Sequence, residues 1–140
     1  MKKAERVVSI RTTVFWGETV AGVFWIGAGL TGMFDNIACN ILNILFLLAA
    51  IVSLVMVFMI YRTGDDSDEM AESNYLKAKA NAGSMLHMVI CSMALISTIF
   101  YDSMQGLDIS WPKVLACLFF VLMGVHNLLI GLYFRKLEAE

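Results

Sequence analysis

Four long apolar runs constrain this chain more than any other feature of its sequence. They cover residues of about 12–34, 36–61, 80–103 and 112–134. A helix needs about 20 apolar residues to cross the hydrocarbon core of a bilayer, and each run is long enough. Backbone polar groups in lipid must bond internally, and the runs are continuous rather than alternating, so helices are expected and barrel strands are not.

The composition points to the same class of protein. The chain is 59% hydrophobic and 16% charged, whereas a soluble domain is about 45–50% apolar and about 25% charged. Its net charge of −2 gives no basic excess for binding nucleic acid. The sequence therefore predicts an all-α integral membrane protein in contact with the lipid bilayer. We expect one domain, residues 1–140, folded as an up-and-down bundle of four transmembrane helices.

The positions of lysine and arginine predict the orientation of the spans. These residues gather in the N-terminal segment, in the loop 62–79 and after the fourth span, while only Lys113 lies on the opposite side. Loops rich in lysine and arginine stay in the cytoplasm. Both termini and the loop 62–79 are therefore expected to be cytoplasmic.

The loop 62–79 opens with an acidic cluster. Its members are Asp65, Asp66, Asp68, Glu69 and Glu72. Acidic residues stabilise the first turn of a helix, so we expect a helix that begins near Ser67 and continues into span three. A divalent-cation site is the alternative interpretation, although the spacing differs from that of an EF-hand loop.

Polar residues within the spans form the candidate site. Glu18, His87 and His126 are the ionisable ones, and Ser53 and Asn127 accompany them. At about 1.5 Å per helical residue, all five lie roughly 10–14 Å from the cytoplasmic ends of their spans. An ionisable residue at such a depth is a functional hypothesis by default. The five residues are expected to form one polar layer.

This layer has several interpretations. It could be a structural hydrogen-bonded layer that fixes helix register. It could be a proton-linked or solute site, since a desolvated carboxyl takes up a proton and histidine titrates near neutrality. Two histidines on adjacent spans are also compatible with bis-histidine haem b. A metal site of Glu18 and the two histidines is the least specific alternative. No cofactor or metal is predicted.

Small and amide side chains predict contacts between the helices. Ala21, Ala28 and Gly32 share one face of span one, where they favour close packing inside the bundle or an oligomer interface. Asn36, Asn40 and Asn43 share a face of span two. We expect this asparagine face to bond to the backbone of span one or to the outer loop. A shallow outer vestibule is the alternative.

The sequence contains no motif typical of an enzyme. It has no GxSxG, Walker loop, GxGxxG or HExxH pattern. Cys39, Cys91 and Cys117 are scattered, which is unlike a disulfide framework or a zinc site. We therefore expect no enzyme activity and no catalytic residue.

The central loop carries a short element, Asp68-Glu69-Met70, followed by Lys77-Ala78. With the four-span layout, this resembles uncharacterised small membrane proteins of bacteria, whose loop carries Asp-Glu-Arg followed by Lys-Ala. Met70 departs from the arginine of that pattern. The resemblance implies a multi-pass protein of the bacterial inner membrane and implies no reaction.

The function expected from these features is non-enzymatic. The chain is predicted to be an accessory, regulatory or self-associating membrane subunit, as a homo-oligomer or with a membrane-protein partner. A small proton-coupled transporter or channel using the polar layer is the alternative. A bis-histidine haem protein is a further alternative.

Overall fold

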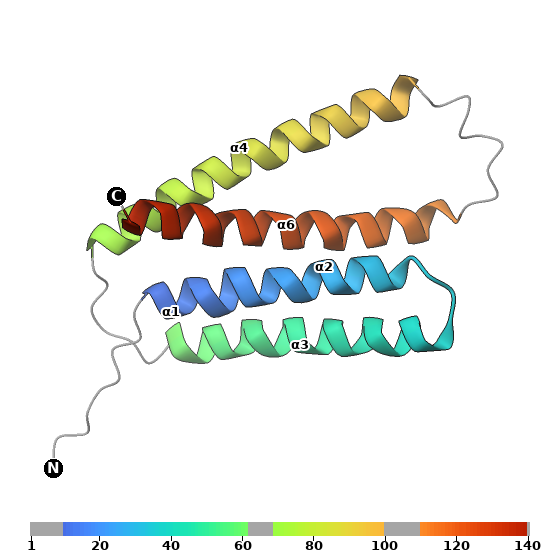
Figure 1. Cartoon of the computed structure of the whole chain (residues 1–140), viewed down its shortest axis with the longest axis horizontal. Helices are drawn as coiled ribbons and strands as arrows, with labels where there is room; N and C mark the ends of the chain where they lie inside the picture. The colour runs from blue at the N-terminus through green and yellow to red at the C-terminus, as the bar shows by residue number, and fades with distance from the viewer. Residues whose placement is uncertain (1–9, 62–68, 100–109, 140) are drawn as a thin grey trace, which may run out of the picture.

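A computed structural model describes residues 10–61, 69–99 and 110–139, and all the regular structure in these ranges is helical. Four helical segments are long and apolar enough to cross a membrane: Ile10–Gly32, Ile37–Met59, Glu69–Ile96 and Trp111–Ala139. The prediction of an all-α chain with four candidate spans is confirmed. Successive helices run in opposite directions, which gives the up-and-down order (Figure 1).

Span one is built from three consecutive helical elements. They are α1 (Ile10–Val14), the π-helix η1 (Phe15–Val20) and α2 (Ala21–Gly32). In η1 the backbone hydrogen bonds join residues five apart instead of four, as in the bond from the N–H of Ala21 to the carbonyl of Trp16. A single π-helical turn within an α-helix is a local widening that is frequent at functional sites.

The other three spans are unbroken helices whose starts follow local rules. α3 is Ile37–Tyr61, and Asn36 Oδ1 caps it by accepting a hydrogen bond from the backbone N–H of Cys39 at 2.8 Å. α6 is Trp111–Ala139 and has Pro112 in its first turn, where a missing N–H costs nothing.

The helix α4 is Glu69–Ile99, with Glu69 and Glu72 in its first turn. It starts two residues after Ser67 and continues into the third apolar run, so the prediction of one helix that begins near Ser67 and continues into this run is confirmed. Asp65, Asp66 and Asp68, and the end of the predicted third span beyond Ile99, lie outside the described residues.

The helices form an open row rather than a closed bundle in the described ranges. The row runs α4, α6, α2, α3, and neither edge helix, α3 nor α4, contacts the other (Figure 1). The short helix α1 does touch α3, α4 and α6 at one end. From that end α4 diverges from α6 along its length (Figure 1). The up-and-down order is as predicted, and within the described ranges the four helices lie side by side in a row.

Glycines bring α2 and α6 into backbone contact. A Cβ atom added to Gly124 would lie 2.5 Å from the carbonyl oxygen of Gly22, and one added to Gly29 would lie 2.6 Å from that of Cys117. Gly131 similarly accommodates the Thr19 side chain. Trp25 stacks on Phe120 across the same junction, with ring centroids 5.4 Å apart. Small residues allow this approach, which is how helices gain packing energy in lipid.

The face predicted from Ala21, Ala28 and Gly32 lies within the chain's own packing. Ala21 and Ala28 are fully buried, and Gly32 lies against Cys117 and Asn43. Asn43 Nδ2 of α3 donates to the carbonyl of Ala28 at 2.6 Å. This is the bond to the backbone of span one that the asparagine face was expected to make.

A cluster of buried apolar side chains lies at one end of the row, where α1, α4 and α6 meet. The cluster consists of Val14, Ala71, Ala78, Ala82, Ile130 and Phe134. By contrast, many large apolar side chains elsewhere are exposed, such as Ile44 at 58% and Leu95 at 67%. An apolar surface this extensive is typical of a protein whose solvent is lipid.

Candidate functional site

Within the described ranges, Glu18 is the only one of the five predicted site residues whose side chain forms a hydrogen bond with another helix. It lies half-buried in η1, and Tyr75 Oη of α4 donates to Glu18 Oε1 at 2.6 Å. A carboxyl group within an apolar span is costly unless it is hydrogen-bonded. The Tyr75 hydroxyl supplies that bond from the helix α4, and the π-helical turn sets the position of the carboxyl.

Tyr75 is a residue that the sequence analysis missed. Its ring packs edge-on against Phe134, with centroids 6.4 Å apart, and Lys79 Nζ lies 4.6 Å from its centroid. The signal was present in the sequence, because Ala71, Ala78 and Ala82 share a helical face with Tyr75. A tyrosine on a small-residue face of a helix that enters the membrane is a candidate partner for a polar group in a neighbouring span.

Three other members of the predicted layer lie on the middle and edge helices. Ser53 is buried in α3 and donates to the carbonyl of Ala50 at 2.8 Å, within its own helix. His126 and Asn127 are half-buried on α6. His126 Nδ1 is buried and has no hydrogen-bond partner among the described residues.

His87 lies apart from the others. It is exposed on α4, nine positions after the fully buried Ala78. At about 100° per residue, nine positions place His87 on the side of α4 opposite Ala78, away from α6. Because α3 and α4 occupy opposite edges of the row, the structure does not bring Ser53 and His87 together. The five residues do not form one layer around a common space, and their functional role stays a prediction.

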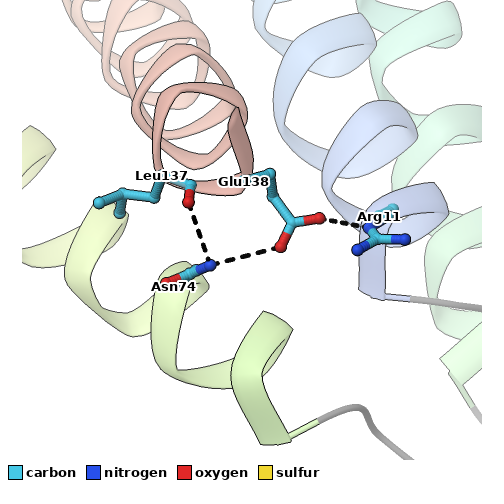
Figure 2. Close-up of polar contacts among 4 residues, drawn as sticks. All are labelled: Arg11, Asn74, Leu137 and Glu138. Atoms are coloured by element: carbon cyan, nitrogen blue, oxygen red, sulfur yellow. Dashed lines mark hydrogen bonds and ion pairs between the residues drawn. The ribbon is translucent and has the colours of Figure 1, made fainter. Parts of the chain in front are cut away.

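A polar cluster joins three helices at the end where α1, α4 and α6 meet (Figure 2). The guanidinium of Arg11 pairs with the carboxylate of Glu138. The buried Asn74 donates to Glu138 Oε1 at 3.4 Å and to the carbonyl of Leu137 at 3.5 Å. One carboxylate on α6 thus holds both α1 and α4. At the opposite end, Lys113 of α6 pairs with Asp35 beside α2.

Beyond Ala78 most residues of α4 up to Ile96 are exposed, and they include an unoccupied face of small and polar residues. Ala80, Ser84, His87 and Cys91 are exposed there, and they lie on the side away from Ala78. A Cβ atom added to Gly83 would meet nothing within 4 Å. Every other described glycine would place a Cβ within about 3.0 Å of a neighbour. Gly83 is therefore the one described glycine that the chain's own packing does not require.

The described residues offer little for a metal. No group of three histidine, cysteine, aspartate or glutamate side chains within them is arranged to hold an ion. Cys39, Cys91 and Cys117 are free thiols with different exposures, Cys117 being buried and Cys91 exposed. His87 points away from α6, which carries His126, so the two imidazoles do not face one haem-sized space within a single chain.

Comparison with known proteins gives no relative. No family model, no curated protein and no solved structure matches the chain. The class that the fold defines is therefore a helical protein with four candidate membrane-spanning segments, and its activity has to be argued from its own residues.

Proposed function

We propose that this chain is a non-enzymatic, multi-pass membrane subunit that assembles with a second copy of itself through α4. The observation that carries the proposal is the unoccupied face of α4, with Gly83 at its centre. Glycine in a helix interior costs roughly 1 kcal/mol relative to alanine. A glycine that its own chain does not need is explained by the close approach of another helix.

The membrane setting follows from the spans and the basic residues. We place both termini and the start of α4 in the cytoplasm, because lysine and arginine lie almost entirely on that side. The resemblance to small bacterial four-span proteins favours the inner membrane. In this orientation the Arg11–Glu138–Asn74 cluster lies at the cytoplasmic end, and α4 diverges from α6 towards the outside.

His87 supports a second copy as the partner. An ionisable side chain facing lipid is costly, so an exposed His87 within the span needs a polar neighbour. A neutral imidazole has one donor and one acceptor nitrogen, so it can bond to an identical imidazole. In a two-fold dimer each residue of the interface meets the same patch on the partner. The α4 face is therefore self-complementary in two ways. Its small residues allow two copies of α4 to approach closely, and His87 can both donate and accept a hydrogen bond.

The open row leaves one side of α4 accessible to a second copy of the chain. α4 is an edge helix, and its outer half contacts little of its own chain. A second α4 would cover Ala80, Gly83, Ser84, His87 and Cys91 without displacing any internal contact of Gly83.

The test uses the native thiol of Cys91. A variant with Cys39→Ala and Cys117→Ala keeps only this cysteine, which we expect to form a cross-linked dimer under mild oxidation in lipid vesicles. Adding Gly83→Leu should abolish the cross-link while leaving the helical content unchanged. The matched control places the single cysteine at Leu115, an exposed apolar position on α6, where we expect no cross-link.

Either of two results would overturn the proposal. One is a chain that stays monomeric in vesicles at every protein-to-lipid ratio tested. The other is a Cys91 cross-link that persists in the Gly83→Leu variant or forms equally from Leu115→Cys, since both indicate random collision.

A small proton-coupled transporter is a second candidate, favoured by the Glu18–Tyr75 hydrogen bond within a π-helical turn. Its test measures the flux of protons into proteoliposomes under a pH gradient. Glu18→Gln should abolish the flux and Tyr75→Phe should alter its pH dependence. Equal flux in empty vesicles and in all variants would remove this candidate. The haem alternative predicts a Soret absorption band in the purified protein.

A further inference from the structure

A pocket of about 340 Å³ opens at the end of the row where the polar cluster lies. It is formed between span one and the last turns of α6. The residues that matter for its chemistry are Arg11, Phe15, Thr19, Phe134, Arg135 and Glu138. Pockets that bind small molecules occupy about 300–1,000 Å³, so this one lies at the lower end of that range.

The mouth of the pocket is positively charged. Arg11 and Arg135 both line it, and Glu138 is the one acidic residue of the lining. Because Arg11 pairs with Glu138, Arg135 is left without a carboxylate among the lining residues. Its guanidinium lies over the ring of Phe15, 5.8 Å from the centroid. The lining thus has a net charge of +1, which a phosphodiester neutralises.

The inner part of the pocket is apolar. Val14, Phe15 and Phe134 line it, and Gly131 lies beside Thr19 at its inner end. Thr19 follows Arg11 by eight residues, or about two helical turns, so the wall runs well into the span. The Thr19 hydroxyl oxygen is buried without a hydrogen-bond partner in the described part of the chain. A matching ligand therefore has an anionic head and an apolar body below it.

We propose that this pocket binds an anionic phospholipid of the cytoplasmic leaflet. The phosphate lies at the mouth with Arg135 and the exposed edge of Arg11, and an acyl chain follows Phe15 and Phe134. Arginine suits this role because its planar fork donates two hydrogen bonds to one phosphate. Basic pockets between transmembrane helices on the cytoplasmic side are suited to lipid headgroups. The inference rests on the proposed orientation and is independent of the α4 dimer.

The site differs from general attraction to a negative surface because its cations are not equivalent. Both Arg135 and the neighbouring Lys136 are exposed, but only Arg135 lines the pocket. Both residues carry one positive charge at the same level of α6. Lys136 is thus a matched control for the loss of charge.

The experiment measures lipid binding to purified protein in neutral detergent, with phosphatidylglycerol and phosphatidylcholine as probes and thermal stability as the readout. We expect phosphatidylglycerol to raise the midpoint of unfolding more than phosphatidylcholine does. Arg135→Gln should weaken the phosphatidylglycerol effect about fivefold in apparent affinity, as expected for one basic residue near an anionic lipid. Lys136→Gln should retain it. Inorganic phosphate at the same concentrations should have no effect, because it leaves the apolar wall unfilled.

Three results would overturn the proposal. They are equal stabilisation by the two lipids, equal losses of the phosphatidylglycerol effect in Arg135→Gln and Lys136→Gln, and stabilisation by inorganic phosphate that matches that of the lipid.

If Arg135→Gln does not fold, a second experiment uses tryptophan fluorescence. Trp25→Phe and Trp111→Phe in the otherwise unchanged chain leave Trp16 as the reporter. Trp16 packs edge-on against Phe15. Brominated phosphatidylglycerol should quench its fluorescence more than brominated phosphatidylcholine does, and equal quenching would refute the site.

Discussion

Replacing Gly124 by alanine tests whether α2 and α6 are held by backbone contact. The new Cβ atom would lie 2.5 Å from the carbonyl oxygen of Gly22 and 2.7 Å from the backbone nitrogen of Ile26. Ordinary contacts begin near 3.4 Å, so the two helices would have to separate by about 0.9 Å. Because both neighbours are backbone atoms, no side-chain rotation relieves the overlap.

The cost follows from this geometry. Overfilling a close-packed contact typically costs about 1–3 kcal/mol, while alanine gains up to about 1 kcal/mol over glycine in a helix. Gly83→Ala measures the gain in helix propensity alone, since its Cβ would meet nothing within 4 Å. The difference in unfolding free energy between Gly124→Ala and Gly83→Ala should therefore be about 1–3 kcal/mol, with Gly124→Ala the less stable.

The assay is unfolding in mixed micelles with increasing sodium dodecyl sulfate, at dilutions where the wild type is monomeric. Circular dichroism reports the helices, and Trp25 fluorescence reports the α2–α6 junction because Trp25 stacks on Phe120. Gly27→Ala should fall between the two variants, since its Cβ would meet only the ring of Phe46, at 3.0 Å. Equal stability of Gly124→Ala and Gly83→Ala, or the reverse order, would refute the backbone contact.

Three further predictions concern the end of the row where α1, α4 and α6 meet. Tyr75→Phe removes the hydrogen bond to Glu18 but keeps the ring, so the unfolding free energy should fall by about 1–3 kcal/mol. The same micelle titration measures this fall, and an unchanged unfolding midpoint would contradict it. Arg11→Gln should lower the unfolding free energy by at most about 1 kcal/mol, because the Arg11 side chain is 64% exposed in its pair with Glu138. A fall of more than about 2 kcal/mol that does not depend on salt would contradict this weak surface pair. A cysteine at Glu72 should react with a membrane-impermeant maleimide only after cells are permeabilised, and labelling of intact cells would reverse the orientation.

The sequence was sufficient to predict the helices and their order along the chain. Apolar length and the acidic start of α4 are local properties, so the four candidate spans and the helix that extends span three could be anticipated. The bond from Asn43 to span one was also expected from its position on the asparagine face. These features depend on residues that are close in sequence or on the length of one segment.

The arrangement of the helices could not be predicted in the same way. After Asn43, α3 is apolar nearly all round, so the rest of its sequence does not indicate which face turns inward. The π-helical turn at Glu18 depends on how span one meets its neighbours, and residue patterns give it no signature. Equal depth of polar residues was therefore insufficient to predict a layer, because His87 has the expected place along α4 and faces outward.

The attachment of α4 has a mechanical consequence. The bonds of Asn74 and Tyr75 and the buried face of Ala71, Ala78 and Ala82 all lie near one end of this helix. The stretch from Gly83 to Ile99 rises about 24 Å beyond that anchorage. It acts as a lever arm, so a tilt of about 5° at the anchored end displaces its tip by roughly 2 Å. Small rearrangements around Glu138 would thus be magnified at the far end of α4.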